Sequence, residues 1–142
     1  MAGQLRVGIV GYGLAGRIFH GQLIDAEPGM RVATVVTRSP QRQAQAAADQ
    51  PGVAVHPSLD EMLAVRGLDL VVIASPNDQH APSALACVEA GVPMVVDKPL
   101  GIDARQARGV VERAAQAGVP LSVFQNRRWD SDVLTLQRLL AD

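Results

Sequence analysis

The stretch from residue 5 to residue 17 constrains the fold more than any other part of the chain; it reads Leu-Arg-Val-Gly-Ile-Val-Gly-Tyr-Gly-Leu-Ala-Gly-Arg. An apolar run ends in Gly11, Gly13 and Gly16, which form the pattern G-x-G-x-x-G between an expected strand and an expected helix. In a dinucleotide-binding turn, the first glycine permits a tight turn, the second lets a pyrophosphate approach the backbone, and the third lets the helix pack close to the strand. The amides of the first helical turn then face the phosphates. The same pattern also occurs in kinase phosphate flaps and in methyltransferases, so its meaning depends on the rest of the chain.

Apolar runs alternate with helical patterns along the whole chain, and short connections rich in Gly and Pro separate them. We expect strands over residues 5–10, 31–37, 53–55, 68–74, 92–96 and 119–124. We expect helices over residues 14–25, 40–50, 59–65, 79–90 and 103–117, with Ser39-Pro40 and Asp103 as helix starts. This alternation predicts an α/β fold of the Rossmann type, a doubly wound parallel sheet in three αβα layers.

The composition limits the partners of the chain. Its 142 residues suit one domain, and 13 basic against 14 acidic side chains leave a net charge of −1. This balance gives no electrostatic reason to expect nucleic acid or an anionic membrane as a partner. The start of the chain does not resemble a secretory signal, and no apolar run approaches the roughly 18 residues that span a bilayer. We therefore expect a cytoplasmic protein that binds neither nucleic acid nor a membrane.

Residue types that often carry chemistry are scarce in this chain. Cys87 is the only cysteine, so no internal disulfide can form, and its apolar helical surroundings favour a buried thiol over a nucleophile. His20, His56 and His80 are far apart and lack clustered carboxylates or thiols, so no metal site is predicted, and the first two are expected to be structural. Lys98 is the only lysine beside twelve arginines, which indicates that an ammonium in particular is needed there.

Polar or glycine-rich clusters follow five of the expected strands. The carboxyl ends of parallel strands meet at one edge of a doubly wound sheet, and ligands bind outside that edge. The opposite edge offers mostly ordinary turns. The clusters therefore predict a single site, formed by Gly11-Tyr12-Gly13, Thr37-Arg38-Ser39, Ser75-Pro76-Asn77, Asp97-Lys98-Pro99 and the run Gln125-Asn126-Arg127-Arg128-Trp129.

The second cluster bears on the choice of cofactor. NAD sites usually carry Asp or Glu at the end of the second strand, where the carboxylate binds the ribose hydroxyls, but this chain has Thr37, Arg38 and Ser39. A carboxylate would repel a 2′-phosphate, whereas an arginine with two hydroxyl neighbours would bind it through charge-assisted hydrogen bonds. The cluster predicts NADP(H) as the preferred cofactor, with NAD(H) as the alternative. Arg38 could instead be a solvated loop charge or stack on adenine.

These motifs together resemble the N-terminal half of the glucose–fructose oxidoreductase/inositol dehydrogenase (Gfo/Idh/MocA) family. The resemblance rests on the glycine pattern, Ser-Pro-Asn-Asp-Gln-His at 75–80, Asp-Lys-Pro at 97–99 and Asn-Arg-Arg-Trp-Asp at 126–130. It covers residues 4–142 and is strongest toward NADP-preferring members that are similar to scyllo-inositol dehydrogenase. It implies a nicotinamide-dependent dehydrogenase that acts on a CH–OH group of a sugar, cyclitol or polyol.

The resemblance implies a catalytic role for Lys98. This residue matches the lysine of the family's Glu-Lys-Pro motif, which lies near the nicotinamide ribose and the substrate hydroxyl and assists proton transfer. A lysine beside a cationic nicotinamide is a chemically sensible acid or base. Asp97 replaces the family's more frequent glutamate with a shorter carboxylate. A structural salt bridge between Lys98 and Asp97, or another carboxylate, is the alternative.

The resemblance also implies roles for residues after the fourth and sixth strands. Asn77 and His80 match a Pro-Asn-x-x-His pattern that lines the cofactor, although His80 is at least as well explained as a structural residue at the helix start. Asn126 and Arg127 match the segment near the nicotinamide, and a domain-junction salt bridge is an equal alternative for Arg127. The full predicted cofactor site comprises Gly11, Tyr12, Gly13, Leu14, Ala15, Gly16, Thr37, Arg38, Ser39, Ser75, Pro76, Asn77, His80, Asp97, Lys98, Asn126 and Arg127.

The final residues suggest a second domain. We assign residues 1–126 to the dinucleotide-binding domain and residues 127–142 to a junction and first helix. Val133, Leu136 and Leu140 give that helix an apolar face, which needs a partner surface; packing back on the sheet is the alternative. The family's second domain supplies an Asp-x-x-x-His arrangement and most contacts to the polyol substrate, and it usually forms the homo-oligomer interface. No such pair follows Arg128.

The predicted function is therefore that of the cofactor-binding domain of an NADP-dependent oxidoreductase. We expect these residues alone to bind the cofactor without turnover. Two rival hypotheses remain at this stage. One is a non-catalytic NADP(H)-binding or redox-sensing module, and the other is a methyltransferase, which Arg38 disfavours because methyltransferase sites prefer an acidic residue there.

Overall fold

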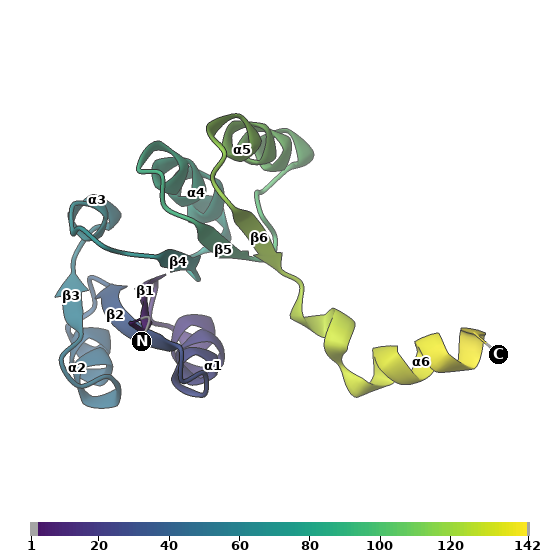
Figure 1. The fold of residues 1–142 in the computed structure, drawn as a ribbon, viewed down its shortest axis with the longest axis horizontal. Coiled ribbons are helices and arrows are strands. Elements are labelled where there is room, and N and C mark those ends of the chain that lie inside the picture. The colour runs from purple at the N-terminus through teal and green to yellow at the C-terminus, as the bar shows by residue number, and fades with distance from the viewer. Residues whose placement is uncertain (1–2, 142) are drawn as a thin grey trace.

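A six-stranded parallel sheet forms the centre of the protein (Figure 1). The structure is a computed structural model, and it describes residues 3–141. The strands lie in the order β3-β2-β1-β4-β5-β6 and pair in parallel throughout, which is the strand order of a doubly wound dinucleotide-binding fold. Their bounds are β1 Leu5–Val10, β2 Met30–Val36, β3 Ala54–His56, β4 Leu70–Ile73, β5 Met94–Asp97 and β6 Leu121–Phe124. The predicted fold class is confirmed.

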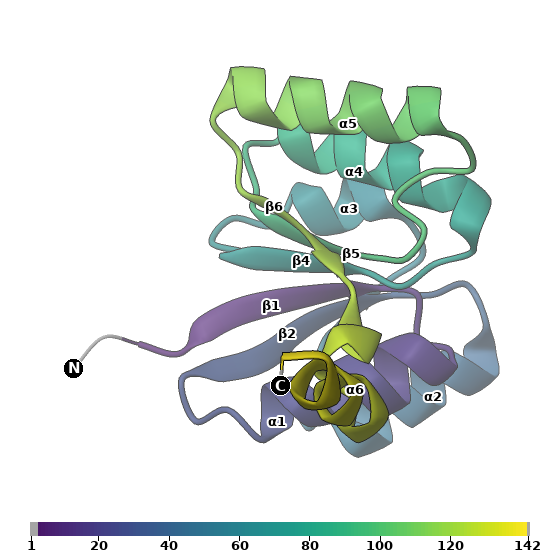
Figure 2. The ribbon, with the colours of Figure 1, turned by 90° about the vertical axis from the view of Figure 1, so that its right-hand side faces the viewer.

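Helices cover both faces of the sheet (Figure 2). One face carries η1 (Ala15–Gly21), α1 (Gln22–Asp25) and α2 (Pro40–Asp49). The other carries α3 (Leu59–Leu63), α4 (His80–Glu89) and α5 (Ala104–Ala117). Two short 3₁₀ segments, η2 (Asn77–Gln79) and η3 (Asn126–Trp129), and the final helix α6 (Ser131–Ala141) complete the chain. The three layers are those predicted from the alternation of strands and helices.

Each face of the sheet has its own apolar core, because successive side chains of a strand point to opposite faces. In β4, Val71 and Ile73 belong to the core beneath α4 and α5, whereas Val72 belongs to the core beneath η1 and α2. This explains why the central strands are apolar at consecutive positions. Cys87 is fully buried in the first of these cores, and burial raises the pKa of its thiol to about 12, so the predicted inert thiol agrees with the structure.

Local sequence signals explain the helix ends. The Ser39 hydroxyl accepts a hydrogen bond from the backbone N–H of Arg42 and precedes a proline in the first turn of α2. Asp103 caps α5 in the same way, and Gly118 ends α5 in the left-handed conformation. The one departure in type is η1, which is a π-helix that continues into α1 where a single α-helix was expected.

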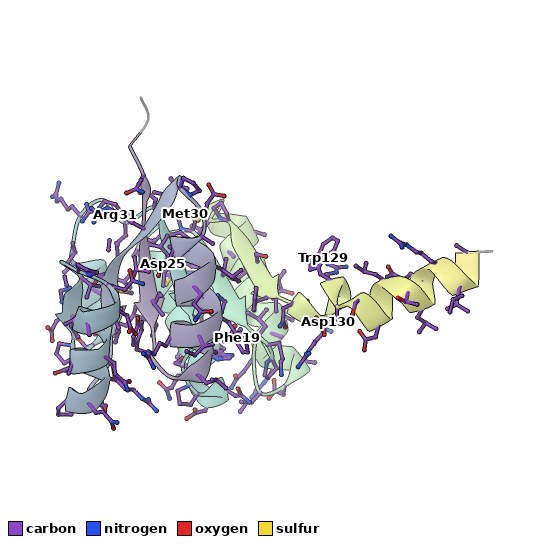
Figure 3. The ribbon with its side chains drawn as sticks, turned by 90° about the horizontal axis from the view of Figure 1, so that it is seen from below. Phe19, Asp25, Met30, Arg31, Trp129 and Asp130 are labelled. Atoms are coloured by element: carbon purple, nitrogen blue, oxygen red, sulfur yellow. The ribbon has the colours of Figure 1, made fainter. Side chains whose placement is uncertain are left out.

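The final helix stands apart from the sheet. Figure 1 shows α6 extending away from the body of the molecule, and none of its residues is buried. Leu136, Leu139 and Leu140 are 57%, 69% and 78% exposed. Trp129, which is 72% exposed, projects from the connection between the sheet and α6 (Figure 3). The alternative that this helix packs back on the sheet is therefore wrong for this structure. Among residues 3–141, no helix has the length and hydropathy of a membrane span.

Candidate functional site

The three glycines of the turn after β1 are required for different reasons. Gly11 has a φ of +93°, and a Cβ there would lie 2.6 Å from the carbonyl oxygen of Ala74. A Cβ on Gly16 would lie 2.0 Å from the carbonyl oxygen of Gly11, which shows how closely η1 packs on the turn. A Cβ on Gly13 would meet only the Arg42 guanidinium, at 3.9 Å. The backbone at residue 13 is therefore open, as the predicted approach of a pyrophosphate requires.

Two cavities flank this turn at the carboxyl edge of the sheet, and both are lined by Ser75. The first has a volume of about 320 Å³ and is lined by Ala15, Phe19, Ala74, Ser75, Asn77, His80, Asp97, Lys98, Phe124, Asn126 and Arg127. The second has a volume of about 300 Å³ and is lined by Val10, Gly11, Val36, Arg38, Pro57, Ser58, Leu59, Asp60, Ser75, Gln79 and Ser83. Three of the five predicted clusters, those after β4, β5 and β6, contribute residues to the first cavity. The other two clusters contribute Gly11 and Arg38 to the second cavity.

Ser75 has an unusual hydroxyl. Its Oγ is buried and has no hydrogen-bond partner among the described residues. A buried polar atom without a partner is costly unless a ligand or water satisfies it. Ser75 lines both cavities, so this unpartnered hydroxyl belongs to a residue that the two cavities share.

Asp97 is the last residue of β5 and is paired in register with Phe124 of β6. Strand alternation places Val96 in the core beneath α4 and α5, and Val95 against the core beneath η1. Asp97 shares the face of Val95, so its carboxylate points toward η1. The end of this strand thereby brings an acidic group to the wall of the first cavity.

His20, in η1, meets that carboxylate. Its Nε2 lies 2.7 Å from Oδ1 of Asp97, and the two side chains are only 5% and 16% exposed. The imidazole also packs against Phe124, with ring centroids 4.5 Å apart. Sequence reasoning missed this pair and assigned His20 a structural role without a partner. The pair spans 77 positions in the sequence, and its only local signal is a histidine on an otherwise apolar stretch of helix.

His80 connects the two loops at the first cavity. Its Nδ1 lies 2.7 Å from the carbonyl oxygen of Pro99, and its Nε2 lies 2.8 Å from the carbonyl oxygen of Ser75. The side chain is buried and also lines the cavity. Both partners only accept hydrogen bonds, so a neutral ring donates to one of them and an imidazolium donates to both. This geometry favours the structural explanation of His80.

Lys98 lies between Asp97, which contacts His20, and Pro99, whose carbonyl oxygen contacts His80. It is exposed and lines the first cavity. No carboxylate of the described residues forms an ion pair with it, and the Asp97 carboxylate contacts His20. The salt-bridge alternative for Lys98 is therefore wrong for this structure.

Arg38 lies at the second cavity, as predicted. Its Nε is 3.4 Å from the carbonyl oxygen of Pro57, and the side chain is exposed. The neighbouring hydroxyls have local roles: Thr37 Oγ1 accepts from the backbone N–H of Ser39, and Ser39 caps α2. Each hydroxyl still has a proton to donate.

Arg42 is a further cation that sequence reasoning missed. Its guanidinium reaches the open side of Gly13 from the first turn of α2. The available signal was its position, four residues after Arg38 and just inside a predicted helix start. Together the two arginines place positive charge beside the glycine turn.

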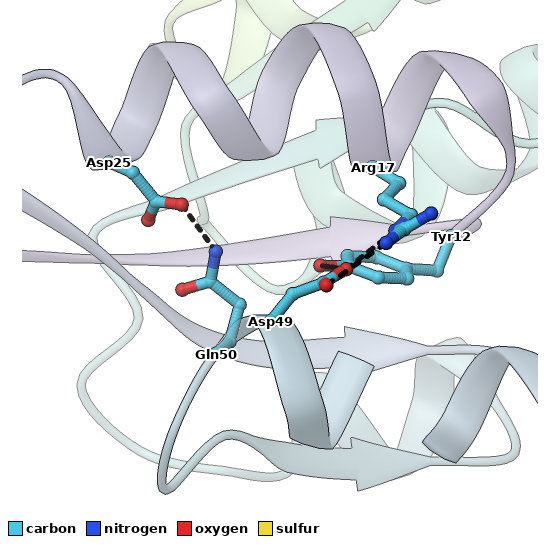
Figure 4. Close-up of polar contacts among 5 residues, drawn as sticks. All are labelled: Tyr12, Arg17, Asp25, Asp49 and Gln50. Carbon is cyan, nitrogen blue, oxygen red and sulfur yellow. Dashed lines mark hydrogen bonds and ion pairs between the residues drawn. The ribbon is translucent and has the colours of Figure 1, made fainter. Parts of the chain in front are cut away.

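Tyr12 was predicted to be a cofactor-binding residue because of its place in the glycine turn. Its side chain is 1% exposed and lies between η1 and α2, where its hydroxyl donates to Asp49 at 3.3 Å (Figure 4). Burial first, and then the charge of Asp49, raise the pKa of Tyr12 to about 12. Arg17 binds the same carboxylate through Nε, at 2.6 Å, and Nη2. Only the backbone of Tyr12 remains at the glycine turn.

Of the remaining predicted residues, two line the first cavity and two line neither cavity. Leu14 is 71% exposed beside the glycine turn, and Pro76 precedes η2 without lining either cavity. Asn126 and Arg127 line the first cavity. Arg127 is paired with Asp130 at 2.8 Å, and this hydrogen bond raises the pKa of its guanidinium. Residues 3–141 contain no group of three or more potential metal ligands.

The fold, the glycine turn and the two flanking cavities define a dinucleotide-binding domain of the doubly wound class. The comparison with protein families identifies it further. Residues 5–125 match the Gfo/Idh/MocA model, described as an oxidoreductase family with an NAD-binding Rossmann fold. The chain belongs to this family, which confirms the resemblance and excludes the methyltransferase hypothesis.

Individual relatives are similar over nearly the whole chain. The uncharacterized oxidoreductase YdgJ of Escherichia coli is 44% identical over 142 residues, which are 100% of this chain and 40% of YdgJ. The NADP⁺-dependent scyllo-inositol 2-dehydrogenase IolW of Bacillus subtilis is 34% identical and aligns with 97% of this chain and 38% of its own. The crystal structure of GenD2 from gentamicin A biosynthesis, in complex with NAD, superposes with a TM-score of 0.90 at 31% identity over 100% of this chain and 40% of GenD2. The chain thus spans about two fifths of the length of these relatives.

Proposed function

We propose that this chain is the cofactor-binding part of an NADP-dependent oxidoreductase that interconverts a secondary alcohol and a ketone on a sugar, cyclitol or related polyol. The family is an NAD-binding oxidoreductase family, and its members include inositol dehydrogenases. Family membership alone does not imply a preference for NADP or a polyol substrate, so these two parts of the proposal need their own support.

Two arginines, Arg38 at the second cavity and Arg42 beside Gly13, carry the choice of NADP. Arg38 stands where NAD sites usually have a carboxylate, and Arg42 adds a second guanidinium beside the glycine turn. Guanidinium groups bind phosphates through charge-assisted, often bidentate hydrogen bonds. A 2′-phosphate between these side chains would neutralise charge that a free ribose hydroxyl leaves unpaired.

The residues present fit a dinucleotide. The open backbone at Gly13 would accept the pyrophosphate, and the unpartnered Ser75 hydroxyl lies between the cavities that would hold its two halves. The adenosine half would occupy the second cavity and the nicotinamide half the first. When bound there, the nicotinamide supplies the hydride chemistry.

The side chains around the first cavity would supply the remaining chemistry. The Lys98 amine would exchange a proton with the substrate hydroxyl, because it is exposed to the cavity and is not paired with a carboxylate of the described residues. The negative charge of Asp97 on the same wall would favour a positively charged ring over a neutral one. We assign substrate selection, a further acid or base and oligomer contacts to a second domain, into which residues 127–142 would lead.

Cofactor titration tests the preference for NADP. We expect the 142-residue chain to bind NADPH at least about tenfold more tightly than NADH, measured by the fluorescence of the reduced nicotinamide, because two charge-assisted contacts distinguish them. Arg38→Ala should weaken NADPH binding and leave NADH binding within about twofold, whereas Arg42→Ala, which removes a guanidinium beside Gly13, should weaken NADPH binding more than NADH binding. Arg31→Ala, an exposed arginine at the opposite end of β2, is the matched control. Tighter binding of NADH by the unaltered chain would overturn the preference.

Substitution of Lys98 tests the catalytic assignment. In the complete enzyme, Lys98→Met should lower kcat by about 10²- to 10⁴-fold, the usual contribution of a positioned acid or base. Lys98→Arg should also fail, because a guanidinium keeps its proton. The Kd for NADPH should change by less than about threefold in both variants. Full turnover by Lys98→Met would remove Lys98 from the mechanism.

A further inference from the structure

The segment Asp97-Lys98-Pro99 is attached to the protein on both sides of its lysine. On one side, the Asp97 carboxylate is held by His20 of η1 at 2.7 Å. On the other, the carbonyl oxygen of Pro99 is held by His80 of α4 at 2.7 Å. These two histidines come from helices on opposite faces of the sheet. The backbone that carries Lys98 is therefore fixed, while its own side chain is free of ion pairs with the described residues.

A carboxylate next to a lysine normally attracts it. Asp97 and Lys98 are adjacent in the sequence and line the same cavity, so an unrestrained Asp97 would be the nearest acidic partner for the ammonium. The structure shows a different pairing. Strand alternation directs Asp97 toward η1, and the buried His20 ring, supported by Phe124, engages Oδ1.

We propose that His20 is a positioning residue for the reaction: it engages the Asp97 carboxylate and so keeps the Lys98 amine unpaired and available for proton exchange. This role rests on the proposed function of Lys98. Without the imidazole, Asp97 turns toward Lys98 and forms the ion pair that the structure lacks. The amine is then held in its protonated form and drawn away from the cavity.

The other charged group at this cavity does not alter the expected pairing. Arg127 also lines the cavity, and its guanidinium is bound by Asp130. His80 is occupied by two backbone carbonyls. Asp97 is thus the lining carboxylate that can compete for the Lys98 ammonium, and His20 is the group that prevents it.

The single lysine makes this proposal directly measurable. Competitive labelling with trace acetic anhydride at pH 8, read by mass spectrometry, reports the reactivity of the Lys98 amine relative to the N-terminal amine, without cofactor or substrate. His20→Phe keeps a ring against Phe124 but has no donor for Asp97. We expect labelling of Lys98 to slow by about threefold to fivefold in this variant, the equilibrium factor of a partly exposed ion pair.

Two further variants separate positioning from a purely structural role. Adding Asp97→Asn to His20→Phe should restore the labelling rate of the unaltered chain, because the competing carboxylate is gone. His20→Gln, which retains a side-chain N–H donor, should label as the unaltered chain does. Arg17→Leu, which breaks the other acid pair of η1, is the matched control and should leave the rate unchanged. If His20→Phe does not fold, as judged by circular dichroism, His20→Ala serves in its place.

The proposal is overturned if a folded His20 variant labels at the unaltered rate, or if Asp97→Asn fails to restore the rate. Because no cofactor is present in the labelling reaction, this failure is distinct from a failure of NADPH binding, which would overturn the proposed function instead.

Discussion

Two basic side chains of η1 contact aspartates in different parts of the molecule, and the two pairs differ in burial and in surroundings. From η1, Arg17 reaches outward to Asp49 of α2, and these side chains are 38% and 29% exposed. Three residues later, His20 reaches inward to Asp97 of β5, where the exposures are 5% and 16%. The outward pair lies where water screens it, so we expect it to contribute little beyond connecting two helices. The inward pair includes Asp97, which lines the first cavity.

Both pairs join a basic side chain to an aspartate, so residue type does not separate them. They differ in burial and in neighbours, because only the inward pair is largely buried and includes a residue that lines the first cavity. Figure 4 shows the outward pair together with Tyr12, and none of these three residues lines the first cavity. The inward pair stands one residue from Lys98. Variants that act on both pairs, or on one alone, can test this distinction.

Gly16→Val should have the largest effect, because it displaces the helix that carries both pairs. Its Cβ would lie 2.0 Å from the carbonyl oxygen of Gly11, a backbone atom, and 3.1 Å from Cγ2 of the buried Ile9. We expect the free energy of unfolding, measured with urea, to fall by about 3 kcal/mol or more, with loss of NADPH binding. Gly21→Ala in the same helix meets only an ordinary contact at 3.4 Å and should change stability by less than about 1 kcal/mol. Equal effects of the two substitutions would contradict the packing argument.

An intermediate effect is expected at Tyr12, the buried member of the outward group. This is the only tyrosine in the chain, so its absorbance near 295 nm reports one phenol. We expect its ionisation in the folded protein at a pKa of about 12, against about 10 in the unfolded chain. The neutral phenol therefore stabilises the fold fully below about pH 10, and this contribution is lost as the pH rises toward 12.

Asp49→Asn sharpens that measurement. It should lower the pKa of Tyr12 only part of the way toward 10, because burial, the largest single cause of the shift, remains when the charge of Asp49 is removed. NADPH binding should be unchanged, since this group lies outside both flanking cavities. A phenol that ionises near pH 10 in the folded, unaltered chain would contradict the burial of Tyr12.

The smallest effect is expected from Arg17→Ala. The hydrogen bond from Arg17 holds the pKa of Asp49 below its ordinary value, so this carboxylate stabilises the fold above its unfolded pKa and loses that contribution as the pH falls. Arg17→Ala should lower Tm at pH 7 by about 2 °C or less, and the difference should vanish toward pH 2. Arg31→Ala removes an exposed arginine without such a partner and should show no comparable pH dependence. If the difference in Tm between Arg17→Ala and the unaltered chain grew as the pH fell, the pKa of Asp49 would not be lowered in the folded state.

Local patterns were sufficient to predict most of the fold. The six apolar runs, the helix starts at Ser39 and Asp103 and the glycine turn each depend on neighbours within a few residues, and all of them appear where expected within one or two positions. The π-helical form of η1 was not predicted, because the amphipathic pattern is nearly the same for both helix types.

The candidate site was predicted only in part, because side-chain directions depend on contacts between distant segments. Tyr12 lies between two glycines of the binding turn, yet its ring fits the space between η1 and α2. The bond between His20 and Asp97 required knowing which face of β5 the carboxylate occupies. Arg42 was within reach of sequence reasoning, since a basic residue in the first turn after Arg38 points back toward the same strand end.

Gly13 differs from the other two glycines of the turn in what the fold requires of it. Unlike Gly11, it does not have a positive φ, and unlike Gly16 it has room for a methyl group, which would make only an ordinary contact with Arg42 at 3.9 Å. The folded state therefore makes no demand for glycine at this position. If variants of this chain were selected for stability alone, residue 13 would be free to drift to alanine while residues 11 and 16 would stay glycine. One short motif thus records two separate selection pressures, one from the chain's own packing and one from the molecule that it binds.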